Sequence, residues 1–149
     1  MPPVSPIFIS AVNSVQKPPF YPLRSPEVTL PSTTPQPGRR DDDPISVTFV
    51  QPDGSRRRCL ARPGETVLDA ALDNAVPGIV GQCGGGCTCA TCHCYVAEPF
   101  RGLLAAPHPD ETEMLAYVWR PGPGSRLACQ IRLARELDGL VVTVPATQA

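Results

Sequence analysis

The sequence CGGGCTCATCHC, residues 83–94, is the most informative stretch of this chain. It contains five of the seven cysteines of the 149-residue sequence, together with three consecutive glycines. Cysteines that lie this close together cannot cross-link distant parts of a small secreted domain. In an intracellular chain, such a cluster is typical of a metal site. The spacing of the thiols is therefore the first question.

Cys83, Cys89 and Cys92 have the spacing C-x5-C-x2-C, and Cys129 follows after a further thirty-six residues. Four thiolates are enough to hold a [2Fe–2S] cluster. The plant-type spacing C-x4-C-x2-C does not fit, because in either possible register its third ligand would not be a cysteine. We therefore expect these four cysteines to hold one [2Fe–2S] cluster. A zinc site of four cysteines is the alternative, although such sites usually combine two close pairs.

The three glycines between the cysteines have an expected role in this loop. Gly84, Gly85 and Gly86 can adopt positive φ angles and let the backbone approach closely at low steric cost. Backbone N–H groups can then point toward the negatively charged sulfides of a cluster. We expect these hydrogen bonds, together with burial, to tune the reduction potential.

The hydrophobic pattern around the loop predicts a mixed α+β domain. Alternating apolar and polar residues predict strands, and a Pro-Asp-Gly turn at 52–54 joins the first two. We expect the first helix to begin after Thr66 and to bury Val67, Leu68, Ala71, Leu72 and Ala75. The predicted elements are, in chain order, strands at 45–49 and 57–61, a helix at 67–75, the cysteine loop, a strand at 95–97, a helix at 109–119, and extended segments at 126–129 and 140–144.

Residues 1–44 have a different composition. They contain eleven of the twenty prolines and many serines and threonines. Such a segment buries too little apolar surface to offset the entropy lost on ordering. We expect a disordered Pro-rich tail at 1–44, which is either a tether or a dispensable extension, and a folded domain at 45–149.

The overall charge excludes some functions. The formal net charge of −1 gives no basic surface for nucleic acid. No apolar stretch approaches the roughly 20 residues of a membrane helix, and the N-terminus lacks a secretory signal. We therefore expect a bacterial cytoplasmic protein that binds no nucleic acid and spans no membrane, with the mitochondrial matrix as the alternative location.

Several motifs outside the loop resemble the adrenodoxin/putidaredoxin family of [2Fe–2S] ferredoxins. That family combines C-x5-C-x2-C-H with a distant fourth cysteine, as found here. The fourth cysteine lies in SRLACQI at 125–131, which resembles the corresponding motif of the family. GETVLDAA at 64–71 resembles its first-helix entry, and LDGLVVTVP at 137–145 resembles its last strand. The resemblance covers residues 45–149.

The resemblance implies a β-grasp ferredoxin fold and a one-electron carrier rather than an enzyme. It implies that Cys83 and Cys89 hold the iron nearer the surface, whereas Cys92 and Cys129 hold the inner iron. An FAD-containing, NAD(P)H-dependent ferredoxin reductase would supply the electrons. A cytochrome P450-type monooxygenase or a related oxygenase would receive them. We expect the carrier to be a monomer.

The second predicted helix begins with Asp110, Glu111 and Glu113. Acids in this position favour the helix dipole. In the family, the acidic helix docks on basic patches of the reductase and the oxidase, so the resemblance implies that these three side chains bind partners. From Ile45 onward the chain has ten acids and nine arginines. Long-range electrostatic steering should therefore be modest.

The remaining residues singled out have structural roles in this interpretation. We expect His93 to hydrogen-bond the loop to the rest of the domain and Arg126 to support the fold. Cys87 is expected to be a bystander thiol and Cys94 to point away from the cluster. We expect Cys59 to be a core residue.

An alternative keeps the fold and changes the partner. Ferredoxins that supply electrons for iron–sulfur cluster assembly also have a cysteine at the position of Cys87 and a Cys-His-Cys run like 92–94. They generally have a longer tail after the final Val-Pro than is found here. The glycines after Cys83 and the Ala-Thr pair before Cys92 are closer to the P450-linked proteins, which we favour. A zinc-stabilised interaction module with a proline-rich arm is a third possibility.

Overall fold

The computed structural model describes residues 38 and 40–148. Most of the expected tail at 1–44 lies outside these described residues. The last part of that segment contacts the domain. The Asp43 carboxylate lies 3.9 Å from the guanidinium of Arg135, which also donates a hydrogen bond to the Arg40 carbonyl. Residues 40–43 are therefore attached to the residues that precede the last strand.

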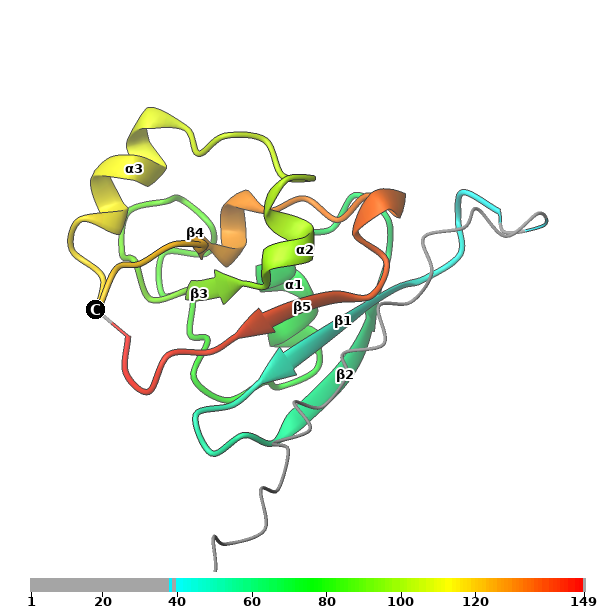
Figure 1. Ribbon diagram of the computed structural model, residues 1–149, viewed down its shortest axis with the longest axis horizontal. Helices are drawn as coiled ribbons and strands as arrows, with labels where there is room; N and C mark the ends of the chain where they lie inside the picture. Colours follow the sequence, from blue (N-terminus) through cyan, green and yellow to red (C-terminus); the bar gives the residue numbers. More distant parts are fainter. Residues whose placement is uncertain (1–37, 39, 149) are drawn as a thin grey trace, which may run out of the picture. The chain divides into compact units, whose positions relative to one another are not determined.

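In the described part of the chain, five strands form one mixed sheet in the order β2-β1-β5-β3-β4 (Figure 1). β1 (Ile45–Val50) and β2 (Arg56–Ala61) form an antiparallel hairpin. β5 (Leu140–Thr143) is parallel to β1 and antiparallel to β3 (His93–Val96), which also pairs with β4 (Ser125–Leu127). Two parallel strands that lie side by side, here β1 and β5, need a long connection between them. The chain from the end of β1 to the start of β5, which includes β2 and the cysteine loop, forms that connection.

The β1–β2 hairpin forms as its sequence pattern predicts. Ile45, Val47 and Phe49 are fully buried. The turn is closed by the Gly54 N–H, which donates to the Gln51 carbonyl at 2.9 Å. Gly54 has a φ of +84°, which glycine adopts without strain. The first helix packs against the β2 strand of this hairpin.

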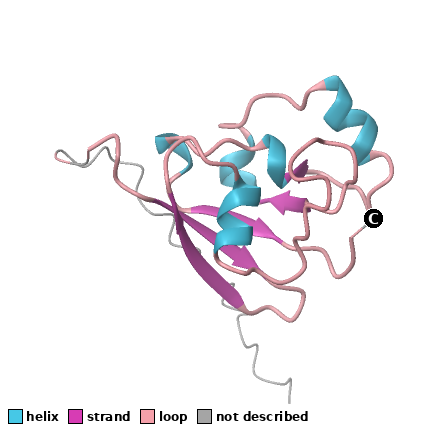
Figure 2. Ribbon diagram, turned by 180° about the vertical axis from the view of Figure 1, so that it is seen from behind, coloured by secondary structure: helices cyan, strands magenta, loops and turns pink. Residues whose placement is uncertain are grey.

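Helix α1 (Val67–Asp73) begins at a capping box. The Thr66 hydroxyl accepts from the Asp69 N–H at 3.1 Å, and the Asp69 carboxylate accepts from the Thr66 N–H at 2.9 Å. Each of these two residues thus accepts, with its side chain, the backbone N–H of the other, which has no partner within the helix. The helix lies across one face of the sheet (Figure 2) and buries Val67, Leu68, Ala70 and Ala71.

The end and the buried face of α1 differ from the prediction. Leu72 is 47% exposed and Ala75 is also exposed. Ala75 has a φ of +48°, which a helix cannot continue through. The Arg57 guanidinium donates to the carbonyls of Asn74 and Ala75 at 3.1 and 2.8 Å and so satisfies the helix end. The expectation that Leu72 and Ala75 are core residues is wrong.

The second half of the domain is more irregular than predicted. A short helix α2 (Glu98–Arg101) was not predicted. Helix α3 (Pro109–Leu115) ends four residues before Trp119, because the Tyr117 N–H bonds the Met114 carbonyl in a tighter turn. Two 3₁₀ turns, η1 (Ala128–Gln130) and η2 (Arg135–Leu137), follow β4, and η1 replaces the expected extended chain at Cys129. None of the helices described here is long and apolar enough to cross a membrane.

Candidate metal centre

The cysteine loop occupies residues 79–92, between the turn after α1 and the start of β3. Its two ends are joined by hydrogen bonds. The N–H groups of Val80 and Gly81 donate to the Thr91 carbonyl at 3.0 and 3.3 Å, and the Gln82 N–H donates to the Thr91 hydroxyl at 3.0 Å. The loop therefore starts and finishes at the same place, and the backbone between these ends is free to enclose a bound group.

The loop backbone is partly left-handed. Gly84 and Gly85 have φ angles of +65° and +95°, and a Cβ on Gly85 would lie 3.9 Å from the Cβ of Cys129. Gly86 is not among the positive-φ residues, so the expected conformation is wrong for this third glycine. Cys87 and Ala90 take positive φ angles instead, at +57° and +54°. A non-glycine residue in this region is strained, and such strain clusters at functional sites.

The four cysteines of the C-x5-C-x2-C…C pattern lie in two pairs. The Cys83 N–H donates to Cys89 Sγ at 3.3 Å, and the Cys89 thiol helps to lower the pKa of Cys83. Cys92 and Cys129 form the other pair, in which each thiol shifts the pKa of the other. Both members of the second pair are buried, whereas both members of the first are half-buried. The Cys83–Cys89 pair thus lies nearer the surface than the Cys92–Cys129 pair.

The pairing suits two metal ions better than one. A [2Fe–2S] cluster takes four thiolates over two irons, so each iron needs only two. The donor set and its grouping therefore fit a two-iron cluster.

Hydrogen bonds favour the thiolate at one member of each pair. The backbone of Thr88 lowers the pKa of Cys83 to about 6. The Cys92 thiol, followed by the Gln130 amide at 3.4 Å, lowers the pKa of Cys129 to about 6. The pKa of Cys92 is raised, because its thiol donates to Cys129 and because it is buried. Iron ligation needs thiolates, and a Cys92 thiolate no longer donates to Cys129. The donors that remain for negative charge on sulfur are the Thr88 backbone at Cys83 and the Gln130 amide at Cys129.

The three other cysteines differ from these four. Cys59 and Cys94 are core residues, 2% and 0% exposed, and burial raises the pKa of both thiols. Cys87 is half-buried in the loop, and burial raises its pKa as well. Its backbone hydrogen-bonds the sulfur of Cys129. Cys87 therefore contributes a backbone donor to the site, and its own thiol favours the protonated form.

Helix α3 does not present its three acids alike. The side chain of Asp110 is 76% exposed and Glu113 is also exposed, whereas Glu111 is 1% exposed. The Glu111 carboxylate accepts from Nε and Nη2 of Arg126 at 2.8 and 3.0 Å, and from the Leu127 N–H at 2.9 Å. The expectation that Glu111 docks on a partner is wrong, because its carboxylate is enclosed and holds β4.

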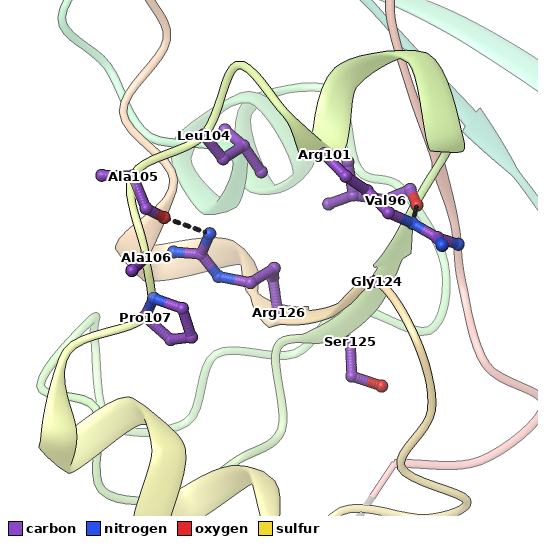
Figure 3. A pocket seen from close by; sticks show the side chains of 9 residues that line it. All are labelled: Val96, Arg101, Leu104, Ala105, Ala106, Pro107, Gly124, Ser125 and Arg126. Carbon is purple, nitrogen blue, oxygen red and sulfur yellow. Dashed lines mark hydrogen bonds between the residues drawn. The ribbon is translucent and has the colours of Figure 1, made fainter.

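Arg126 also lines a hollow of about 250 Å³ that contains no cysteine (Figure 3). Its Nη1 donates to the Ala105 carbonyl at 2.9 Å. On the far side, Arg101 Nε donates to the Val96 carbonyl at 2.8 Å, and it lies where a Cβ on Gly124 would be. Both guanidiniums bond backbone here and so support the fold. The lining residues are Val96, Arg101, Leu104, Ala105, Ala106, Pro107, Gly124, Ser125 and Arg126.

His93 joins the exit of the loop to the neighbouring strand. Its Nε2 lies 3.0 Å from the Ser125 hydroxyl, and its ring contacts the edge of Tyr95 with the ring centroids 4.7 Å apart. Burial lowers the pKa of His93 to about 4, so the ring is neutral at pH 7. The Tyr95 hydroxyl donates to the Arg120 carbonyl at 2.8 Å. This chain of contacts extends from the loop to the segment after α3.

Sequence reasoning missed three polar side chains at this centre. The Thr91 hydroxyl lies 3.0 Å from the Cys89 sulfur, Gln130 donates to Cys129, and Gln148 bonds the backbone of His93. Thr91 and Gln130 each adjoin a candidate ligand in the sequence, which could have indicated them. Gln148 has no such local indication, because its partner lies fifty-five residues away.

The comparisons with known proteins agree with this geometry. The model of the 2Fe-2S iron-sulfur cluster binding domain matches residues 50–134. Putidaredoxin from Pseudomonas putida is 45% identical over 103 residues, which are 68% of this chain and 96% of that protein. The ferredoxin in a solved covalent putidaredoxin reductase–putidaredoxin complex is 44% identical, with a TM-score of 0.65, over 67% of this chain and 97% of that one. An ISC-like [2Fe–2S] ferredoxin from Pseudomonas putida is 28% identical, with a TM-score of 0.60, over 70% of this chain and 95% of that one.

These matches show the class of protein. The chain belongs to the [2Fe–2S] ferredoxins, within the adrenodoxin/putidaredoxin family, and has their β-grasp fold. It carries one [2Fe–2S] cluster, and it is an electron carrier rather than an enzyme.

The pairing of thiols leads to a prediction about the ligand set. Replacing Cys83, Cys89, Cys92 or Cys129 by serine should abolish the cluster or change its EPR spectrum, because a neutral hydroxyl is a poor substitute for a thiolate. Cys87→Ser, in the same loop, is the matched control and should keep the native spectrum. Visible absorption and EPR of anaerobically purified variants measure this. A native spectrum in Cys89→Ser, together with cluster loss in Cys87→Ser, would contradict the assignment.

The buried ion pair leads to a prediction about stability. Glu111→Gln should lower the free energy of unfolding by about 3–5 kcal/mol, because it leaves the Arg126 guanidinium buried without its counter-charge. Glu113→Gln, on the exposed face of the same helix, should change it by less than about 0.5 kcal/mol. Anaerobic denaturant unfolding followed by circular dichroism measures both. Equal effects of the two substitutions would show that the pair does not stabilise the fold.

Proposed function

We propose that this ferredoxin carries single electrons from an FAD-containing, NAD(P)H-dependent ferredoxin reductase to a cytochrome P450-type monooxygenase. Cys83, Cys89, Cys92 and Cys129 hold its cluster in this proposal. The observation that carries the proposal is the arrangement of these thiols as one half-buried pair and one buried pair. The outer pair brings the redox centre near the surface, where a partner can reach it. The inner pair ties it to β3 and η1.

The cluster supplies one-electron redox chemistry when bound. The chain's own contribution is to hold that charge and to shield it. The backbones of Thr88 and Cys87 and the amide of Gln130 donate to cysteine sulfurs. Such donors stabilise the more negative, reduced state and so raise the reduction potential. Burial of Cys92 and Cys129 limits water at the inner side of the site.

The reductase as electron donor is supported by the relative described above. The structure of that putidaredoxin was solved in a covalent complex with putidaredoxin reductase. The similarity to the present chain covers 97% of the length of that putidaredoxin. The oxygenase as acceptor is supported by the family resemblance of the motifs at 64–71, 125–131 and 137–145. In this proposal the ferredoxin acts as a monomer in the bacterial cytoplasm, where it transfers electrons from the reductase to the oxygenase.

The surface charge suggests how partners approach. The sequence has no charged residue between Asp73 and Glu98, a stretch that contains the whole cysteine loop. Charge near the site must therefore come from other elements, and Asp110 and Glu113 on α3 are exposed. We assign the docking charge to these two residues, with neutral contacts over the loop itself.

Electron transfer can be measured directly with a reductase of the putidaredoxin reductase type. With NADH in excess and no oxygen, the reductase should bleach the visible bands of the ferredoxin with the uptake of one electron per chain. Adding a ferric cytochrome P450-type monooxygenase under carbon monoxide should then reoxidise the ferredoxin, and its visible bands should return. Failure of the reductase to reduce a ferredoxin that dithionite does reduce would contradict the proposed donor.

The docking residues lead to a separate prediction. The double variant Asp110→Asn/Glu113→Gln should raise the KM of the reductase for the ferredoxin about three- to tenfold at low salt, and should reduce its dependence on ionic strength. The visible and EPR spectra should stay native. Asp53→Asn in the β1–β2 turn is the matched control and should leave KM unchanged. An unaltered KM and salt dependence in the double variant would show that α3 does not dock.

Electron supply for iron–sulfur cluster assembly is the second candidate function. It is favoured by the similarity to the ISC-like ferredoxin and by the presence of Cys87 in the loop. The prereduced protein can be offered a cysteine desulfurase with its scaffold in place of the P450. Faster reoxidation by the desulfurase and scaffold than by P450s of this class would favour the assembly function over the oxygenase.

A further inference from the structure

The side chain of Gln148 bridges the two ends of the cysteine loop. Its Nε2 donates to the carbonyl of Gly78, directly before the loop, and to the carbonyl of His93, directly after it, at 3.2 Å in the latter case. Its Oε1 accepts from the N–H of His93 at 3.1 Å. The chemistry of these three backbone groups fixes the amide orientation, since only the oxygen can accept from the N–H and only the nitrogen can donate to the carbonyls.

The segment that carries Gln148 is itself held in place. The Val144 N–H donates to the Val50 carbonyl at 2.8 Å. Val144 also packs so closely on the turn before the loop that a Cβ on Gly78 would lie 2.7 Å from its Cγ1. After β5 the chain turns back toward the side of the domain that carries the start of β3 (Figure 1). The bridge is therefore anchored on the sheet at one end and on the loop at the other.

One peptide unit receives most of this restraint. The peptide between Cys92 and His93 has its carbonyl bonded by the Ala128 N–H at 2.9 Å, next to Cys129. Its N–H has two acceptors, the Ala90 carbonyl at 3.3 Å and Gln148 at 3.1 Å. Without Gln148 that N–H keeps only the longer bond. The backbone that orients the Cys92 thiol would then be held by the Ala128 N–H and this longer bond alone.

We propose that Gln148 is a positioning residue for the Cys92–Cys129 side of the site. Its side-chain amide holds the two ends of the cysteine loop together, at Gly78 and His93, and fixes the backbone at Cys92. This inference rests on the ligand assignment proposed above. It gives the chain after β5 a role in cluster retention. The hydrogen bonds involved join neutral groups at a half-buried position, so each contributes modestly, and the three act together.

The test compares Gln148→Ala and Gln148→Glu with a matched glutamine. Gln51 donates to the Pro77 carbonyl at 3.3 Å, one residue before Gly78, but has no bond to His93. Gln51→Ala therefore removes an amide from the same turn and leaves the loop exit intact. Gln148→Glu keeps the acceptor for the His93 N–H, but it places a carboxylate oxygen against two carbonyls.

Holoprotein is exposed to an iron chelator without oxygen, and the decay of the visible bands gives the rate of cluster loss. Gln148→Ala should lose its cluster about fivefold faster than the wild type, and Gln148→Glu at least as fast. Both should shift the EPR g values of the reduced form. Gln51→Ala should match the wild type in rate and spectrum. Wild-type decay and spectra in both Gln148 variants, or the same acceleration in Gln51→Ala, would overturn the proposal.

Hydrogen exchange separates this proposal from the ligand assignment. In the wild-type holoprotein the His93 amide should exchange slowly, and Gln148→Ala should speed its exchange more than that of the Val144 amide. Fast wild-type exchange at His93 would overturn the role of Gln148. A native cluster in Cys92→Ser would overturn the ligand assignment instead, and it would leave the exchange result to stand by itself.

Discussion

The placement of Cys129 depends on a buried carboxylate. Glu111 on α3 pairs with Arg126 and accepts the Leu127 N–H, so one side chain fixes β4 just before η1. The carbonyl of Cys92 then accepts from the Ala128 N–H. Together these bonds bring a cysteine thirty-six residues beyond the loop to the side of Cys92. A buried pair of charges is not a strong source of stability by itself, and its value here is that it specifies one position for β4.

The centre built in this way has a buried inner half and an outer half near the surface. Cys92 and Cys129 lie in the core with β3 and η1, whereas Cys83 and Cys89 belong to a loop closed at its neck by Thr91. The stretch from Asn74 to Ala97 has no charged side chain. A partner that contacts this stretch need not desolvate any charge there, so short contacts around the centre cost little. In the proposed exchange, the charge of Asp110 and Glu113 on α3 would orient the encounter without entering the contact itself.

Local patterns in the sequence were enough to predict much of the fold. The alternation in β1, the turn at Gly54 and the start of α1 after Thr66 each depend on neighbouring residues, and the structure has all three. The family and its cluster followed from the cysteine spacing and the matching motifs. The tail at 1–44 lies mostly outside the described residues, and its disorder stays a prediction.

The errors arose where a distant partner determines the outcome. Glu111 has the sequence context of an exposed helix acid, and only its pairing with Arg126, fifteen residues away, buries it. Leu72 fits an apolar helical pattern, but the face that α1 turns toward the core is the one with Val67, Leu68, Ala70 and Ala71, and Leu72 lies outside it. The run of three glycines predicts the same conformation for Gly86 as for its neighbours, yet the left-handed residues of the cysteine loop after Gly85 are Cys87 and Ala90. The bridge made by Gln148 joins residues that only the fold brings together.

The most direct test of the central claim is the metal content and the low-temperature EPR spectrum of the protein, reconstituted with iron and sulfide and then reduced with dithionite. Two pairs of thiols around one cluster predict two irons and two acid-labile sulfides per chain, and a spin-half signal that integrates to one electron. A single tightly held zinc ion per chain, with no signal after reconstitution, would contradict the account.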